Sequence, residues 1–170
     1  MEFEKYIRDI PDFPEKGIVF KDITTLLIDS EAFSKVIDKM ADTYKGKGID
    51  KVVGIESRGF IFGGMLSYIL GAGFVPARKA GKLPYKTIRE SYSLEYGESI
   101  IELHEDSINK GDKILLVDDL LATGGTAEAV VKLIKRLGGE ISGIEFLIEL
   151  DFLNGREKLI GENINSVIHY

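Results

Sequence analysis

Hydrophobic residues along the chain form short continuous runs that alternate with longer segments in which they recur periodically. The continuous runs predict buried strands, and they span residues 51–55, 73–78, 113–119 and 141–150. The periodic segments predict helices at 59–70 and 127–139, which end at Gly71 and Gly138. Apolar strands that alternate with helices are typical of an α/β fold, with a mainly parallel sheet flanked by helices.

The remaining segments are more polar, and each predicts one element. Residues 2–10 predict a short helix that ends before Pro11, and 17–24 predict an extended segment. Residues 30–44 predict an amphipathic helix with Ser30 as its N-cap. The polar stretch 79–98 contains an alternating pattern that predicts an arm of a hairpin.

Composition narrows the classes of protein that fit. A chain of 170 residues with 44% hydrophobic and 29% charged residues is expected to form one domain, residues 1–170. The net charge of −6 argues against a nucleic-acid partner, and the absence of cysteine excludes disulfides and thiolate chemistry. No apolar run reaches the roughly 18 residues of a membrane span, and the charged N-terminal segment lacks a signal-peptide core. We therefore expect a cytoplasmic protein that contacts neither nucleic acid nor membrane.

Two loops follow strands of the predicted sheet, at the edge where ligands bind in such folds. They are "ESRG" at 56–59 and "DDLLATGGT" at 118–126. Small residues that open a helix allow backbone N–H groups to approach a phosphate, and two carboxylates beside it can accept hydrogen bonds from the hydroxyls of a sugar. The alternatives, in which these residues bind no ligand, are a tight strand–helix turn for the small residues and a solvated acidic turn for the two aspartates. Because neighbouring strand residues face opposite ways, both acids can reach one ligand only if the strand ends near Asp118.

The second loop does not fit the common nucleotide motifs. The Walker A pattern requires a Lys followed by Ser or Thr, and the dinucleotide fingerprint requires GxGxxG; neither occurs in the two loops. The loop at 118–126 is therefore predicted to hold a single monophosphate.

An apolar strand, two acids and then ATGGT resemble the phosphoribosyl-diphosphate signature of the type I phosphoribosyltransferases. Within that family the chain is similar to the adenine-specific members over nearly its whole length. The matching segments are "DFPEKGIVFKDIT", "GIESRGFIFG", "ARKAGKLP", "SYSLEYG", "VDDLLATGGT" and "GREKL". The resemblance implies the type I phosphoribosyltransferase fold, with a flexible lid hairpin over 80–98 and a small N-terminal hood.

The same resemblance implies a reaction and its requirements. Phosphoribosyl diphosphate and adenine would give AMP and pyrophosphate in purine salvage. Mg2+ would be the cofactor, held mainly through substrate oxygens and water rather than by direct protein ligands. The active form would be a cytosolic homodimer.

Carried over by position, the resemblance also implies site residues. Asp118 and Asp119 would hold the ribose hydroxyls and act in catalysis, and Glu95 would be a catalytic acid near N7 of adenine. The 5′-phosphate would be bound by Ala122, Thr123, Gly124, Gly125 and Thr126. Pyrophosphate would be bound by Ser57, Arg58, Arg78, Lys79 and Lys82, with one of the cations of "RKAGK" able to act in a partner's site. Adenine would be bound by Val19, Phe20 and Lys21, where Lys21 replaces an Arg expected in many relatives.

Without the resemblance, several of these residues have ordinary structural interpretations. Glu95 is then an exposed residue of a hairpin, Phe20 a core residue, and Arg58 a surface residue before a helix. Two other functions also remain open. One is a phosphoribosyltransferase for a 6-oxopurine or a pyrimidine, and the other is a non-catalytic sensor of phosphoribosyl diphosphate, which the acidic charge and short chain disfavour.

Overall fold

The structure is a computed structural model that describes residues 2–93 and 98–170. It divides into two compact units, Met1–Lys39 and Met40–Tyr170. Among the described residues, no helix combines the length and the apolar character that crossing a membrane requires.

The first unit is built on a two-stranded antiparallel ribbon. Its elements are the 3-10 helix η1 (Phe3–Tyr6), strands β1 (Arg8–Pro11) and β2 (Val19–Asp22), helix α1 (Thr24–Ile28) and most of α2 (Ser30–Asp42). The predicted helix over 2–10 is wrong beyond Tyr6. Strand β1 instead pairs with β2, where Arg8 donates to the Asp22 carboxylate and Lys21 forms an ion pair with Asp9.

Helix α2 begins where the sequence predicts, but a different residue caps it. Ser30 is already the first helical residue, and the Asp29 carboxylate accepts a hydrogen bond of 2.9 Å from the backbone N–H of Ala32. Asp29 therefore satisfies one of the free amides at the start of the helix, the role that we predicted for Ser30.

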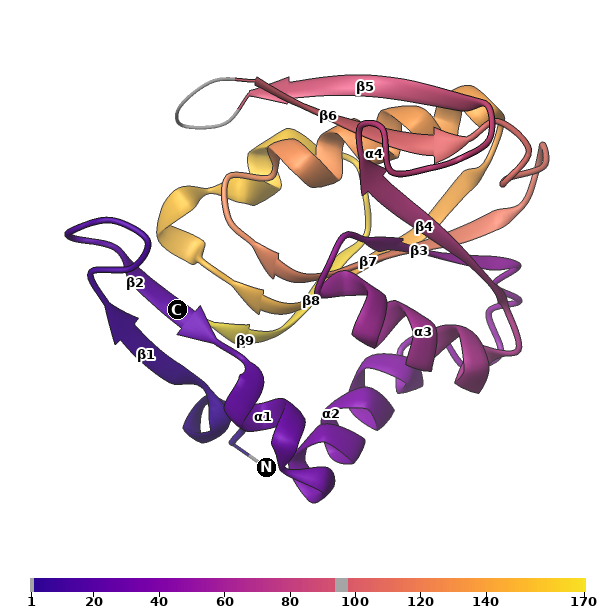
Figure 1. The fold of residues 1–170 in the computed structure, drawn as a ribbon. Helices are drawn as coiled ribbons and strands as arrows, with labels where there is room; N and C mark the ends of the chain where they lie inside the picture. The colour runs from indigo at the N-terminus through magenta and orange to yellow at the C-terminus, as the bar shows by residue number, and fades with distance from the viewer. Residues whose placement is uncertain (1, 94–97) are drawn as a thin grey trace. The chain divides into compact units, whose positions relative to one another are not determined.

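The second unit contains a sheet of seven strands (Figure 1). The strand order is β5–β6–β4–β3–β7–β8–β9, and the five strands from β4 to β9 are parallel to one another. The strands are β3 (Lys51–Ile55), β4 (Gly73–Lys79), β5 (Thr87–Ser93), β6 (Glu98–His104), β7 (Lys113–Leu121), β8 (Glu140–Glu149) and β9 (Ile164–His169). The helices are α3 (Gly59–Leu70), α4 (Gly125–Leu137) and the short 3-10 segments η2 (Asp151–Leu153) and η3 (Gly155–Leu159).

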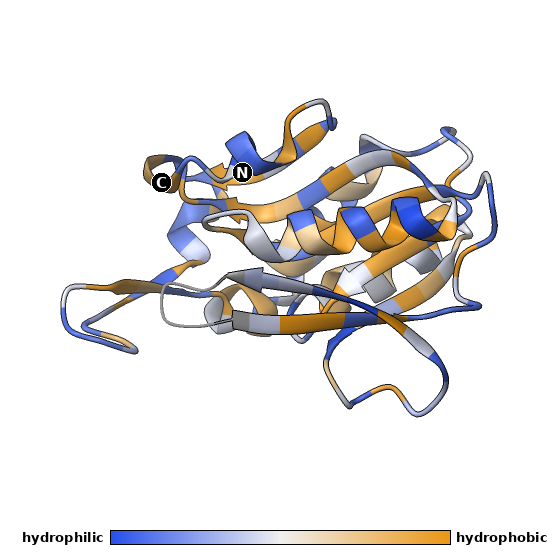
Figure 2. Cartoon of the chain, turned by 90° about the horizontal axis from the view of Figure 1, so that it is seen from above, coloured by the Kyte–Doolittle hydropathy of each residue, from blue (hydrophilic) through white to orange (hydrophobic). Residues whose placement is uncertain are grey.

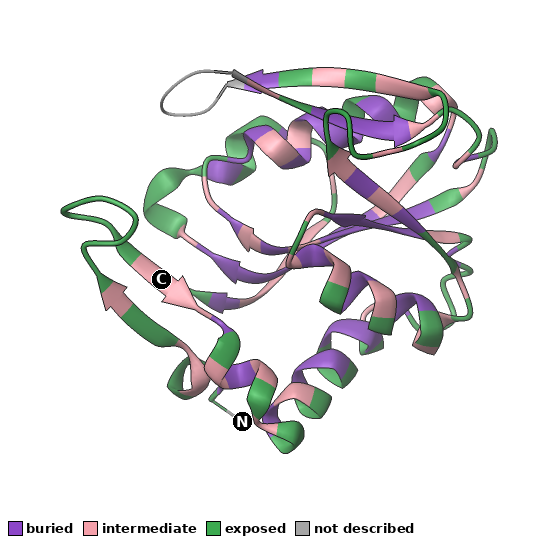
Figure 3. Ribbon diagram, viewed as in Figure 1, coloured by how far each residue is buried: buried purple, intermediate pink, exposed green. Residues whose placement is uncertain are grey.

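The two long helices of this unit cover opposite faces of the sheet. Helix α3 packs on β3, β4 and β7, while α4 packs on β5 to β8, and Figure 1 shows them on either side of the central strands. The central strands are largely hydrophobic in Figure 2, and Figure 3 shows their residues as buried. The predicted α/β class, with a mainly parallel sheet flanked by helices, is confirmed.

The polar stretch after β4 forms an antiparallel hairpin, as predicted. Strands β5 and β6 pair from Thr87–His104 to Ser93–Glu98, and β6 joins the sheet through β4. Strand β9 was not predicted. Among the described strands it pairs with β8 alone, at one edge of the sheet.

One polar cluster lies inside the second unit. Glu145 of β8 is fully buried, and its carboxylate accepts hydrogen bonds from Tyr44 Oη at 3.0 Å and from Asn165 Nδ2 at 2.8 and 2.9 Å. Burial, and then the adjacent charge of Glu145, raise the pKa of the Tyr44 phenol. The phenol therefore stays a donor, and the buried carboxylate keeps its partners.

Candidate active site

A cavity of the second unit opens at the carboxyl ends of β3 and β7. Its volume is about 620 Å³, within the range of small-molecule sites. It is lined by Ile55, Glu56, Ser57, Arg58, Lys79, Lys82, Tyr92, Asp118, Asp119, Leu120, Ala122 and Thr126. Both loops that the sequence singled out therefore border one cavity.

The two aspartates reach this cavity by a different route from the predicted one. Strand β7 does not end near Asp118 but continues to Leu121, so that expectation is wrong. However, β3 pairs with β7 only as far as Val117. Beyond Val117, none of the described strands pairs with this side of β7, and Asp118 and Asp119 border the cavity there.

The aspartates lie in an environment that disfavours two charges. Burial and the charge of Asp119 raise the pKa of Asp118 well above its ordinary value. Burial also raises the pKa of Asp119, although Arg58 acts in the opposite direction. Arg58 Nε lies 2.7 Å from Asp119 Oδ2 in an ion pair, yet this oxygen is buried with no hydrogen bond to any described residue. The pair therefore retains unused capacity to accept hydrogen bonds.

The glycine loop after β7 forms a hollow of its own. Gly124 has a φ of 80°, a left-handed conformation that favours glycine, and helix α4 begins at the next residue. The hollow is about 80 Å³ and is lined by Asp118, Leu120, Leu121, Ala122, Thr123, Gly124, Gly125, Thr126, Ala127 and Phe146. The first N–H groups of a helix have no acceptor within the helix, so a helix start that is flanked by two threonine hydroxyls suits a phosphate group.

A buried glutamate organises the cations predicted for pyrophosphate. The Glu56 side chain is 8% exposed; it accepts hydrogen bonds from Arg78 Nε at 3.3 Å and from the Lys79 amide at 3.0 Å, and it pairs with the Lys82 ammonium. Burial acts to raise the pKa of Glu56, but the bonds from Lys82, Lys79 and Arg78 outweigh it and lower that pKa. Lys79 and Lys82 line the cavity, whereas Arg78 is not among the described residues that line it and donates from Nη1 to the Lys82 carbonyl at 3.3 Å.

The predicted adenine-binding residues belong to the first unit. Val19, Phe20 and Lys21 form strand β2 of the first unit. There Phe20 packs edge-on against Phe13, with ring centroids 5.3 Å apart, and the Lys21 ammonium lies 2.7 Å from Asp9. Glu95 lies outside the described residues.

Sequence reasoning missed Glu56 and Tyr92 among the residues of the cavity. Glu56 had a signal, because an acidic residue directly after a buried strand occupies the ligand-binding edge of a parallel sheet. Tyr92 had none, because its place depends on how the hairpin β5–β6 joins the sheet.

Comparison with known proteins assigns the chain to a family. The family model of the phosphoribosyl transferase domain matches residues 23–156. An adenine phosphoribosyltransferase of Thermotoga neapolitana is 55% identical over 170 residues, which cover all of both chains. The chain belongs to the adenine phosphoribosyltransferase family.

Solved structures of adenine phosphoribosyltransferases share the fold as well. The crystal structure of the Thermoanaerobacter pseudethanolicus protein superposes with a TM-score of 0.96 at 50% identity, covering 99% of this chain and 98% of that one. The Giardia lamblia protein, crystallised with 9-deazaadenine, gives a TM-score of 0.93 at 42% identity, covering 99% and 96%. The type I phosphoribosyltransferase fold is thus confirmed, and the protein is a pentosyl-transferring enzyme.

Proposed function

We propose that the protein transfers the 5-phosphoribosyl group of phosphoribosyl diphosphate to adenine, releasing AMP and pyrophosphate in cytoplasmic purine salvage, with residues 1–170 working as one domain. One observation carries the proposal: the acid pair Asp118–Asp119, the glycine loop and Arg58 border the same cavity. A phosphorylated sugar with a diphosphate leaving group has the three kinds of group that these residues recognise.

The roles follow from the chemistry of each part. The loop from Ala122 to Thr126 binds the 5′-phosphate, and the two aspartates accept hydrogen bonds from the ribose hydroxyls. Ser57, Arg58, Lys79 and Lys82 face the diphosphate, since cations and hydroxyl donors match its oxygens. Arg78 acts on the diphosphate too, in this site or in a partner's.

In the transfer step, N9 of adenine forms a bond to C1′ while the bond from C1′ to the diphosphate oxygen breaks. The leaving group takes the electron pair, and adenine gives up a proton. Positive charge develops on the ribose ring, where Asp118 and Asp119 stabilise it, and Arg58 and Lys82 stabilise the departing pyrophosphate. The chain therefore acts by positioning and electrostatics, without a covalent nucleophile.

Adenine recognition rests on the resemblance of Val19, Phe20 and Lys21 to the family's base-binding segment. The Giardia relative with 9-deazaadenine supports this class of base. Lys21 is engaged with Asp9, so we place its contact with adenine on the backbone rather than on the side chain. Glu95 is proposed as the acid near N7.

The cavity residues fit a magnesium ion. Mg2+ takes oxygen ligands, and the carboxylates of Asp118 and Asp119 line the cavity, where they can accept hydrogen bonds from water bound to the ion. We place the ion on substrate oxygens and water, beside Asp118 and Asp119 and without a direct protein ligand. Bound there, it would neutralise charge on the diphosphate.

We also propose that the enzyme is a homodimer. Helix α3 exposes apolar side chains at one-turn spacings, with exposures of 39% for Ile61, 40% for Met65 and 85% for Tyr68. An apolar stripe on one helix suits a second copy of the chain. Light scattering coupled to gel filtration tests this proposal, and Met65→Asp is expected to shift the mass to that of a monomer.

Product formation tests the activity. Phosphoribosyl diphosphate and Mg2+ are supplied with adenine, hypoxanthine, guanine or orotate in separate reactions. AMP from adenine alone is the expected result. Product from another base would agree with the assigned ribose-phosphate site but would contradict the assignment of adenine as the base. Binding of phosphoribosyl diphosphate with no product from any base would indicate a sensor instead of an enzyme.

A further inference from the structure

The glycine loop touches a second segment of the chain, residues 154–159, backbone against backbone. A Cβ atom built on Gly124 would lie 2.3 Å from the Gly155 carbonyl oxygen. A Cβ built on Gly155 would lie 2.3 Å from the Ala122 carbonyl oxygen and 2.9 Å from Leu121 Cδ1. Because Cβ atoms approach other heavy atoms no closer than 3.0 Å, any side chain at 155 must displace the loop or its support.

Conformation does not require glycine at position 155. The residues with positive φ include Gly124 and Asn154 but not Gly155. An alanine backbone is therefore allowed at this position, and the contact with the loop alone forbids the side chain.

The segment behind the loop is itself firmly held. Arg156 forms a two-pronged pair with Glu149 at the end of β8, with Nε 2.6 Å and Nη2 2.7 Å from the two carboxylate oxygens. Arg156 Nη1 also donates to the Ile164 carbonyl at 3.3 Å, and Ser166 Oγ donates to Glu149 at 2.6 Å. Leu159 anchors the other end of the segment in the core. These contacts tie the support of the loop to β8 and β9.

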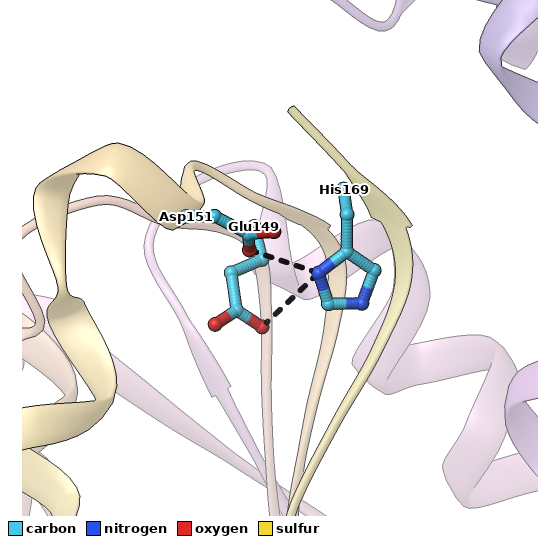
Figure 4. A group of neighbouring side chains, drawn as sticks. All are labelled: Glu149, Asp151 and His169. Atoms are coloured by element: carbon cyan, nitrogen blue, oxygen red, sulfur yellow. Dashed lines mark hydrogen bonds and ion pairs between the residues drawn. The ribbon is translucent and has the colours of Figure 1, made fainter.

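The Glu149 carboxylate belongs to a cluster with Asp151 and His169 (Figure 4). His169 Nδ1 lies 2.9 Å from Asp151 Oδ1 and 3.9 Å from Glu149 Oε2. Such a group resembles a metal site, but Arg156 already engages both oxygens of Glu149. Burial acts to raise the pKa of Glu149, and the bonds from Arg156 and Ser166 outweigh it and lower that pKa. We therefore interpret the cluster as an anchor for Arg156.

We propose that Gly155 and Arg156 are positioning residues that set the place of the phosphate loop. The inference rests on the proposed function, in which the loop binds the 5′-phosphate of the substrate. A side chain at 155 must move one backbone by at least about 0.7 Å to reach an allowed contact. Anion binding by backbone N–H groups depends on their aim, because a hydrogen bond weakens steeply when its distance and angle are lost; for reacting groups, a misplacement on the order of 1 Å can cost about 100-fold in rate.

The test compares ligands that carry the 5′-phosphate with one that does not. In Gly155→Ala, calorimetric Kd values for ribose 5-phosphate and AMP are expected to rise about tenfold or more, while that of magnesium pyrophosphate stays within about twofold. Gly73→Ala is the matched control, because a Cβ there makes only ordinary contacts, the nearest of them 3.6 Å from Lys51 Cγ, and no positive φ is involved. A structural role alone would lower stability and leave all three Kd values of the folded protein unchanged.

Three further variants keep the proposal testable. Arg156→Met is expected to weaken the binding of ribose 5-phosphate, and Arg156→Lys is expected to restore part of that affinity. These two variants test the positioning role if Gly155→Ala fails to fold. Unchanged affinity in the folded variants overturns the positioning role. Thr126→Ala removes a hydroxyl of the loop itself. If Thr126→Ala leaves ribose 5-phosphate binding unaltered, the assignment of the phosphate site fails, and with it the basis of the inference.

Discussion

Replacing Asp118 by Asn is expected to make the enzyme more stable and less active. Asn has the shape of Asp, and its side-chain oxygen can still accept the hydrogen bond of 2.9 Å from the Asp119 amide. The change removes a buried charge next to Asp119. Two unit charges in near contact, about 4 Å apart, repel by about 4 kcal/mol at an effective dielectric constant of about 20, and the lost attraction to Arg58 offsets part of this gain. We expect the free energy of unfolding at pH 7 to rise by about 1–2 kcal/mol.

The raised pKa of Asp118 predicts how the stability difference between the two proteins changes with pH. Because folding raises the pKa of Asp118, the folded protein binds the proton more tightly than the unfolded chain. That contribution to stability is fully present below the ordinary pKa of 3.8 and is lost as pH rises through the raised value. Asn carries no charge at any pH, so the advantage of Asp118→Asn should be present at pH 7 and vanish near pH 3.

Thermal and urea unfolding of both proteins from pH 3 to pH 8 measure the effect. A gain of 1 kcal/mol corresponds to roughly 2–4 °C in Tm for a chain of this size. Asp119→Asn is the contrasting variant, because it leaves Arg58 without its carboxylate partner and should stabilise less. A variant Asp118→Asn that is less stable at pH 7, or equally favoured at pH 3 and pH 7, would refute the reasoning.

Three further predictions concern single groups. Asp119→Asn should lower kcat by about 100-fold with the fold intact, and unchanged turnover in steady-state kinetics would contradict its role. Glu56→Gln removes the charge that holds Lys82, so the ammonium is freer to bind pyrophosphate and the inhibition constant of pyrophosphate should fall about threefold. A higher inhibition constant would contradict the idea that Glu56 and pyrophosphate compete for Lys82. Tyr44→Phe takes a donor from buried Glu145 and should cost about 1–2 kcal/mol in urea unfolding at constant kcat, whereas a loss of activity without a loss of stability would oppose this structural role.

The parts of the fold that sequence predicted are those whose burial is nearly complete. Strands β3, β7 and β8 are apolar runs because both of their faces are covered, and α4 shows its apolar face in its periodicity. Strands β1 and β9 lack that signal. Within the described part of the chain each pairs with a single strand and carries exposed residues, so its extended conformation depends on that partner strand rather than on its own residues.

The candidate site divides in the same way between local and distant contacts. Asp118, Asp119 and the glycine loop follow one another along a strand, a turn and a helix, so their composition alone predicts a sugar-phosphate site. Gly155 carries no such signal, since its importance lies in a carbonyl oxygen of another segment. The small residues of the loop explain how closely an anion can approach, but they do not fix where the loop stands. That position depends on Arg156 and Glu149, so substitutions outside the cavity should change the affinity for phosphate while every residue that contacts the substrate stays the same.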